Sequence, residues 1–252
     1  MADVTLSPLS VPRRWLRPTQ NVTLQFPEDL DPTGGKHGMS VADRRCTFTP
    51  CHVDDQGQLS ILTRNGRVTG LLGLPRPYQT LTAEVIGVGG GFPPEMLANA
   101  RSSVCIAGGT GIAPFLTMPD YGASRKAKLC WSVRSDDFGA IEFVLQEGLL
   151  RAEDWAEVCV FVTSGEDGTG VVAQKPAAWW QATFTALREV HPAGRLSFEK
   201  RRMNECDPVV EGGETSDSKK SVFFCGSKSL EWQVRMWAMM SSGATVYCTE
   251  VL

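Results

Sequence analysis

The chain has 252 residues, of which 42% are hydrophobic and 21% are charged, and its formal net charge at pH 7 is -3. These values are typical of a globular protein with a core of useful size, in one large or two modest domains. The small negative charge argues against general nucleic-acid binding. Because no apolar run reaches the roughly 18 residues of a membrane helix, we expect no membrane insertion.

Up to about Asn99 the sequence contains short strand candidates broken by Gly, Pro and Asp. These are NVTLQF (21–26), RRCTFTP (44–50), QLSILTR (58–64) and LTAEVIGV (81–88). Between the last two lies a helical candidate, GRVTGLLGL (66–74). Short β-rich runs at this spacing predict a small antiparallel barrel or sandwich.

After Arg101 the pattern changes to continuous apolar strand candidates that alternate with helical candidates. The strands are SVCIAG (103–108), AKLCWSV (127–133), EVCVFVT (157–163), SVFFCG (221–226) and ATVYCTEV (244–251). The helices are IAPFLTM (112–118), GAIEFVLQEGLL (139–150), KPAAWWQATFTALREV (175–190) and KSLEWQVRMWAMM (228–240). This alternation predicts a parallel sheet with crossover helices.

We therefore predict two domains, with residues 1–100 forming an antiparallel β-barrel and residues 101–252 an α/β domain with a five-stranded parallel sheet. The 8 cysteines show no CxxC spacing and several fall inside apolar runs, where a free cysteine behaves as a small hydrophobe. The 3 histidines are isolated, so we expect no metal site. The N-terminus lacks a signal-peptide layout, and we expect a reduced, cytoplasmic protein.

The segment VCIAGGTGIAPFL (104–116) carries the first functional signal. Ligands of parallel α/β sheets bind at the carboxyl ends of strands, where a glycine turn lets the backbone approach an anion closely. Gly108, Gly109 and Gly111 suit that role, and Thr110 adds a hydroxyl donor. A tight strand–helix turn without a ligand remains the alternative.

A second strand candidate ends in Cys225-Gly226-Ser227 and again leads into a helix. Together with the glycine turn and the preceding β-rich half, this pattern resembles the ferredoxin–NADP reductase superfamily, which includes cytochrome b5 reductases and the reductase modules of flavohaemoglobins. The resemblance covers roughly Val22 to Val251. It implies that Gly108, Gly109, Thr110 and Gly111 hold the pyrophosphate of NAD(P)H, and that Cys225 and Gly226 line the nicotinamide pocket.

The resemblance also implies that the β-rich half binds FAD through two motifs. GRVT, which is Gly66, Arg67, Val68 and Thr69, matches the family's G-x-x-(S/T) motif for the FAD phosphates. Simple turn capping is the alternative for that segment.

The family's other flavin motif, R-x-(Y/F)-(S/T), is not intact in DRRCTFTPCH (43–52). Aligning Phe48 and Thr49 with the aromatic and hydroxyl residues puts Cys46 where the family has arginine. Aligning Arg44 with that arginine puts Cys46 in the aromatic position. We prefer the Phe48/Thr49 register, with Arg44, Arg45 or Arg67 supplying the missing charge.

The choice of coenzyme depends on the ribose 2′ position, where a phosphate requires Arg or Lys. Ser164 and Arg195 would suit a phosphate, which slightly favours NADPH over NADH, although either residue could also be solvated surface. Glu250 lies near the position where relatives keep an acid close to the flavin.

The resemblance therefore predicts an FAD-dependent NAD(P)H oxidoreductase in which Thr49, Cys225 and Glu250 act in catalysis. Electrons would pass to a separate acceptor protein or to a small-molecule substrate such as a quinone. The degenerate flavin motif motivates an alternative, in which the fold has lost redox function and catalyses cyclisation or isomerisation of a hydrophobic small molecule in a biosynthetic pathway. A regulatory module that signals nucleotide occupancy is a third possibility.

Overall fold

The computed structural model describes residues 17, 19–28, 40–54, 59–63, 70–71, 83–93, 95–96, 103–118, 127–134, 137–163, 182, 185, 196–199, 203, 220–240 and 244–250. The chain divides into two compact units. The first comprises Met1–Gly91, Ala113–Thr117 and Glu250–Leu252, and the second comprises Phe92–Ile112 and Met118–Thr249. The boundary between residues 100 and 101 stays a prediction.

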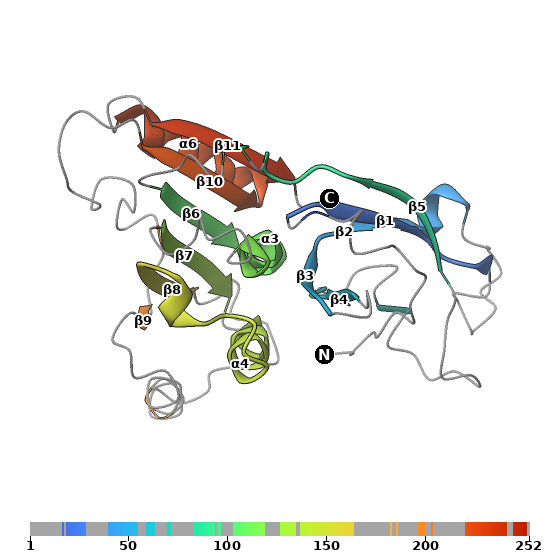
Figure 1. The fold of residues 1–252 in the computed structure, drawn as a ribbon, viewed down its shortest axis with the longest axis horizontal. Helices are drawn as coiled ribbons and strands as arrows, with labels where there is room; N and C mark the ends of the chain where they lie inside the picture. The colour runs from blue at the N-terminus through green and yellow to red at the C-terminus, as the bar shows by residue number, and fades with distance from the viewer. Residues whose placement is uncertain are drawn as a thin grey trace. The chain divides into compact units, whose positions relative to one another are not determined.

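The first unit is built from antiparallel strands, as predicted (Figure 1). One sheet has the order β2-β1-β5, with β1 at Asn21–Gln25, β2 at Arg45–Phe48 and β5 at Glu84–Gly89. A second antiparallel pair joins β3 (Pro50–Val53) to β4 (Leu59–Ile61). The alternating apolar residues of β1 form the core of this unit with neighbouring side chains, namely Val22, Leu24, Phe26, Leu59 and Ala83.

The second unit contains a sheet of order β11-β10-β6-β7-β8-β9. Its strands are β6 (Ser103–Gly108), β7 (Ala127–Arg134), β8 (Glu157–Thr163), β9 (Leu196–Glu199), β10 (Ser221–Gly226) and β11 (Thr245–Glu250). The pairs from β10 through β6, β7 and β8 to β9 are all parallel, which confirms the predicted parallel sheet. Strand β9 was not among the predicted strands, because its four residues alternate apolar and polar and lie in a charged segment.

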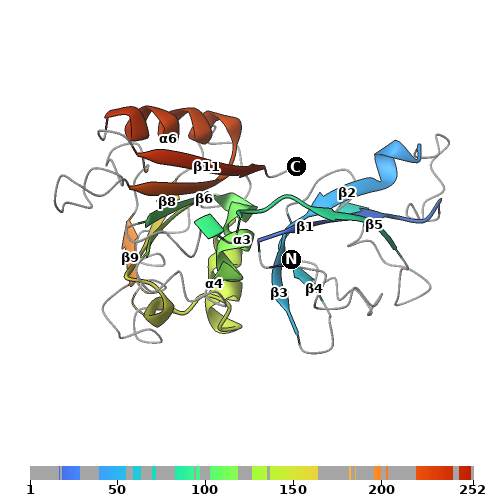
Figure 2. The same ribbon diagram turned by 45° about the horizontal axis from the view of Figure 1, so that its top comes forward.

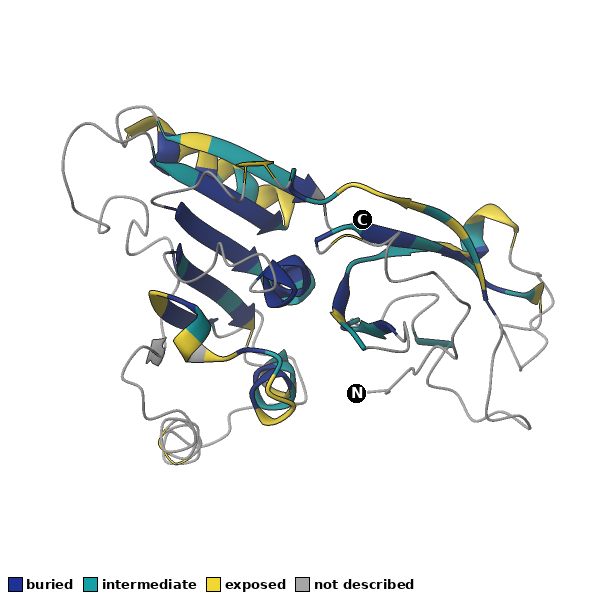
Figure 3. Cartoon of the chain, viewed as in Figure 1, coloured by how far each residue is buried: buried dark blue, intermediate teal, exposed yellow. Residues whose placement is uncertain are grey.

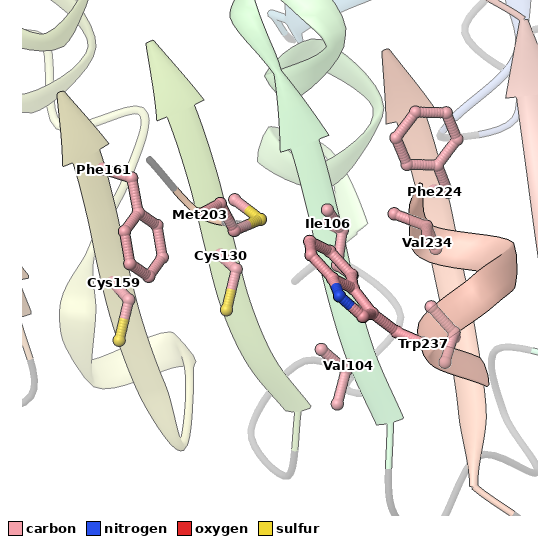
Figure 4. Close-up of a cluster of buried hydrophobic side chains, with 10 residues drawn as sticks. Val104, Ile106, Cys130, Cys159, Phe161, Met203, Phe224, Val234 and Trp237 are labelled. Atoms are coloured by element: carbon pink, nitrogen blue, oxygen red, sulfur yellow. The ribbon is translucent and has the colours of Figure 1, made fainter. Parts of the chain in front are cut away.

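The central strands are buried on both faces, which explains their continuous apolar runs (Figure 3). On one face, side chains of β6, β7, β8 and β10 form a cluster with Val234 and Trp237 of α6 (Lys228–Met240) (Figure 4). Helix α4 (Phe138–Gln146) covers the opposite face (Figure 2) and buries Ile141, Val144 and Leu145. The two faces therefore have separate apolar cores.

Two of the predicted helices are confirmed by α4 and α6, and the predicted segment 112–118 contains the short helix α3 (Ala113–Leu116). Short 3-10 turns lie at η3 (Ala42–Arg44), η4 (Gly109–Ile112) and η8 (Ala152–Asp154). The predicted helices 66–74 and 175–190 lie largely outside the described residues. Among the helices that the structure describes, none is both long and apolar enough to cross a membrane.

Candidate functional site

The two glycine-containing strand ends predicted from the sequence lie side by side. Strands β6 and β10 are parallel neighbours, with Ala107 opposite Cys225. The chain leaves β6 through Gly108 and η4, and it leaves β10 through Gly226 and Ser227 into α6. Residues more than a hundred positions apart in sequence therefore meet at the carboxyl edge of the sheet, where α/β folds bind their ligands.

The close approach of these two ends accounts for three of the glycines. A Cβ atom on Gly111 would overlap the carbonyl oxygen of Cys225 and would lie 2.7 Å from its carbonyl carbon. A Cβ atom on Gly108 would lie 3.1 Å from Leu230 Cδ2, and one on Gly226 would lie 3.1 Å from the amide nitrogen of Gly108. Gly111 is thus required by the packing of the chain on itself, with or without a ligand, whereas a Cβ atom on Gly108 or Gly226 would displace its neighbours by a few tenths of an ångström.

Gly108, Gly109 and Thr110 are half-buried, whereas Gly111 is buried. Gly109 has a φ of +56°, in the left-handed region that side chains with a Cβ atom rarely adopt. Its carbonyl oxygen accepts a hydrogen bond from Trp131 Nε1 at 2.9 Å. Trp131 was not among the predicted site residues, although a tryptophan in a buried strand needs a partner for its N–H group and so signals a polar contact.

The side chain of Cys225 is fully buried. Burial, with a smaller contribution from Cys248, raises the pKa of Cys225 to about 12. The thiol is therefore neutral at pH 7 and is unsuited to act as a nucleophile or a base. The role predicted for Cys225, which is to place the nicotinamide, requires only its shape and remains a prediction.

In the first unit, the residues of the predicted flavin motif lie at the end of β2 and make contacts within the unit. The ring of Phe48 packs against the core and meets Phe26 edge-on, with 6.3 Å between ring centroids. The hydroxyl of Thr49 donates a hydrogen bond of 2.6 Å to Asn21 Oδ1. The donor proton that the motif would offer to a flavin is thus used by the chain itself, and the half-buried Phe48 ring packs against the core of its own unit.

Arg44 is also engaged inside the first unit. Its side chain is only 8% exposed and its Nη2 lies 3.6 Å from Glu28 Oε1. Its Nη1 donates to the Phe26 carbonyl at 3.1 Å, while the Phe26 amide donates to the Arg44 carbonyl at 3.0 Å. This reciprocal pair ties η3 to the end of β1, so Arg44 has a structural function in addition to its predicted contact with FAD.

Several predicted site residues fall outside the part of the chain that the structure describes. These are Gly66, Arg67, Val68, Thr69, Ser164 and Arg195, together with the side chain of Glu250, whose backbone ends β11. Their predicted roles remain predictions.

We expect Thr49→Val to destabilise the first unit by about 1–2 kcal/mol, because Asn21 Oδ1 loses its hydrogen-bond donor in a buried position. Urea unfolding of Thr49→Val, Asn21→Ala and the double variant gives a double-mutant cycle that isolates the pair. Strictly additive effects in that cycle would show that the hydrogen bond contributes nothing.

No protein-family model matches the chain, and no curated protein matches it. Solved structures do resemble it. Flavohemoglobin from Malassezia yamatoensis with bound FAD and heme matches with a TM-score of 0.54 and 14% identity, over 93% of this chain and 51% of that protein. The flavohem-like FAD/NAD binding domain of nitric oxide dioxygenase from Vibrio cholerae O1 biovar El Tor matches with a TM-score of 0.51 and 11% identity, over 92% of this chain and 85% of that domain.

An intact type IV self-sufficient cytochrome P450 monooxygenase also matches, with a TM-score of 0.51 and 13% identity, over 98% of this chain and 24% of that protein. The chain therefore spans about half the length of the flavohemoglobin and about a quarter of the monooxygenase. At these identities the comparisons establish the fold alone. The chain has a two-domain fold similar to that of these solved structures, with an antiparallel β-domain followed by a parallel α/β domain.

Proposed function

We propose that this chain is an NAD(P)H-dependent oxidoreductase that holds the dinucleotide at the loop following β6. The observation that supports this proposal is the half-buried Gly109–Thr110 segment, which lies beside the end of β10 at the carboxyl edge of a parallel sheet. Ligands of this class of sheet bind at that edge. The same fold carries bound FAD in the flavohemoglobin structure.

The donors of this loop fit an anionic group. Gly109 and Thr110 offer backbone N–H groups and one hydroxyl, and the segment Gly108–Ile112 contains no acidic side chain. A pyrophosphate would be held by these donors, while Cys225 and Gly226 would position the nicotinamide next to them. When bound, NAD(P)H supplies a hydride; the residues of the chain bind and orient the dinucleotide and limit the access of water.

The described residues of the predicted flavin motif do not fit FAD as they stand. The half-buried Phe48 ring packs against the core, the Thr49 hydroxyl is bonded to Asn21, and the Arg44 guanidinium is bonded to the Phe26 carbonyl. Our proposal that FAD binds depends on the fold and on Gly66–Thr69 and Glu250.

The same contacts favour a second candidate function. If Phe48, Thr49 and Arg44 stabilise the β-domain and do not bind a flavin, the chain can retain this fold without redox activity. The chain would then catalyse a cyclisation or an isomerisation of a hydrophobic small molecule.

In the first candidate, the oxidoreductase, electrons would pass to a separate acceptor protein or to a small molecule. This reaction would take place in the cytoplasm, and NADPH would be slightly preferred over NADH.

An absorbance spectrum of the purified chain, with and without added FAD, separates the two candidates. The oxidoreductase proposal predicts a flavin band in the chain after desalting, and bleaching of that band by NADPH under anaerobic conditions. NADH serves as the matched comparison for coenzyme preference. A chain that retains no FAD after incubation with excess FAD would overturn flavin dependence and would favour the non-redox candidate.

A further inference from the structure

Trp131 reaches the glycine loop from the neighbouring strand. In the pairing of β6 with β7, Trp131 lies opposite Ala107, and both side chains are fully buried. Paired residues of adjacent strands point to the same face of a sheet, so the indole lies beside a single methyl group. That small neighbour leaves room for the indole N–H to donate to the Gly109 carbonyl, two residues beyond Ala107, at 2.9 Å.

This hydrogen bond helps to hold the orientation of one peptide group of the loop, which also belongs to the 3-10 turn η4. A trans peptide is planar, so its C=O and N–H groups point in opposite directions. With the Gly109 carbonyl held by the indole, the N–H of Thr110 is directed away from Trp131. Gly108 and Gly111, on either side, are already restrained by their contacts with Gly226 and Cys225. The Trp131 hydrogen bond thus restrains the segment between those packed glycines.

We propose that Trp131 is a positioning residue for dinucleotide binding, which holds the Gly109–Thr110 peptide in the orientation that presents the Thr110 N–H to the pyrophosphate. This inference rests on the proposed function. The hydrogen bond restrains the loop before the ligand arrives, and a preorganised loop pays less ordering entropy on binding. Trp131 itself touches neither the coenzyme nor the reacting atoms.

The test compares Trp131→Phe with Trp155→Phe in the full-length chain. Both tryptophans are fully buried in the second unit. Trp155 precedes β8, toward the amino edge of the sheet and away from the loop. Trp131→Phe keeps an aromatic ring and removes the donor. Two quantities are measured: the hydrogen–deuterium exchange rates of the amides in Gly109–Phe115, and the dissociation constant of NADP+ by calorimetry.

We expect Trp131→Phe to raise the exchange rates of these amides and to weaken NADP+ binding by about two- to tenfold, the range expected for loss of one hydrogen bond. Trp155→Phe should change neither the exchange rates nor the dissociation constant, even if both variants lower the melting temperature to a similar extent. NADP+ affinity that is equal in Trp131→Phe and the unaltered chain overturns this inference alone. Absence of binding of both NADP+ and NAD+ in the unaltered chain overturns both the inference and the proposed nucleotide site.

Discussion

Replacing Gly111 by alanine should destabilise the second unit by at least about 3 kcal/mol, whether or not a nucleotide is present. The added Cβ atom would overlap the Cys225 carbonyl oxygen and lie 3.1 Å from the Gly226 amide nitrogen. Both are backbone atoms of a buried strand end, so they cannot move aside as a flexible side chain would. Urea unfolding, monitored by tryptophan fluorescence, measures the decrease in the free energy of unfolding.

Gly139→Ala provides the matched control. Gly139 lies in α4 with no atom within 4 Å of the position of its Cβ atom. Alanine in a helix should stabilise the same unit by about 0.5 kcal/mol. If Gly111→Ala were as stable as Gly139→Ala but bound NADP+ poorly, the glycine would serve the ligand and not the packing of β6 against β10.

The stability of the second unit should fall steeply above about pH 8.5, the ordinary pKa of a cysteine in an unfolded chain. Burial raises the pKa of Cys105, and burial with Cys248 raises the pKa of Cys225 to about 12. A hydrogen bond with Cys159, together with burial, raises the pKa of Cys130. These three thiols therefore stay protonated in the folded chain at a pH where the unfolded chain has lost its thiol protons.

The sign follows from proton binding. Above about pH 8.5 the unfolded state binds fewer protons than the folded state, so the free energy of unfolding decreases as the pH rises. The contribution of the thiols is complete below that pH and is lost as the pH rises toward the folded pKa values. Each thiol contributes a slope of about 1.4 kcal/mol per pH unit, which gives about 4 kcal/mol per unit for the three together.

Urea unfolding at several pH values between 7.5 and 10.5, in the presence of a non-thiol reductant, measures this slope. Cys105→Ala should reduce it by about 1.4 kcal/mol per pH unit, because one buried thiol is removed while all other titrating groups are kept. An identical slope in Cys105→Ala and the unaltered chain would contradict the assignment to buried thiols.

The strands and helices that form the two domains could be predicted from local patterns. The run Val104–Ala107 is uniformly buried in β6, as its uninterrupted apolar sequence predicts. Helix α6 spans the predicted residues 228–240, because its apolar residues recur with helical spacing after the strand end at Gly226. Strand β9 was missed, because a four-residue edge strand has too short a pattern to be distinguished from a loop.

The site was only partly predictable. The sequence indicated the glycine turn after β6 and the Cys-Gly end of β10, and the comparisons confirm the fold in which such ends meet. The sequence could not show that Gly111 packs on the Cys225 carbonyl, that Thr49 donates to Asn21, or that Phe48 packs against Phe26. Each of these contacts joins segments that are distant from each other in the sequence.

The sequence by itself determined the series of elements, their division into a β-rich half and an α/β half, and the glycine-containing ends of β6 and β10. Only the tertiary structure decided which of those glycines serve packing and which peptide group Trp131 holds. Periodicity and apolar runs report how strongly each residue avoids water, which is a local property. Which atom a polar group bonds to, and which atoms leave no room for a Cβ atom at a glycine, depend on strand order and register. Both are set by the packing of the whole domain.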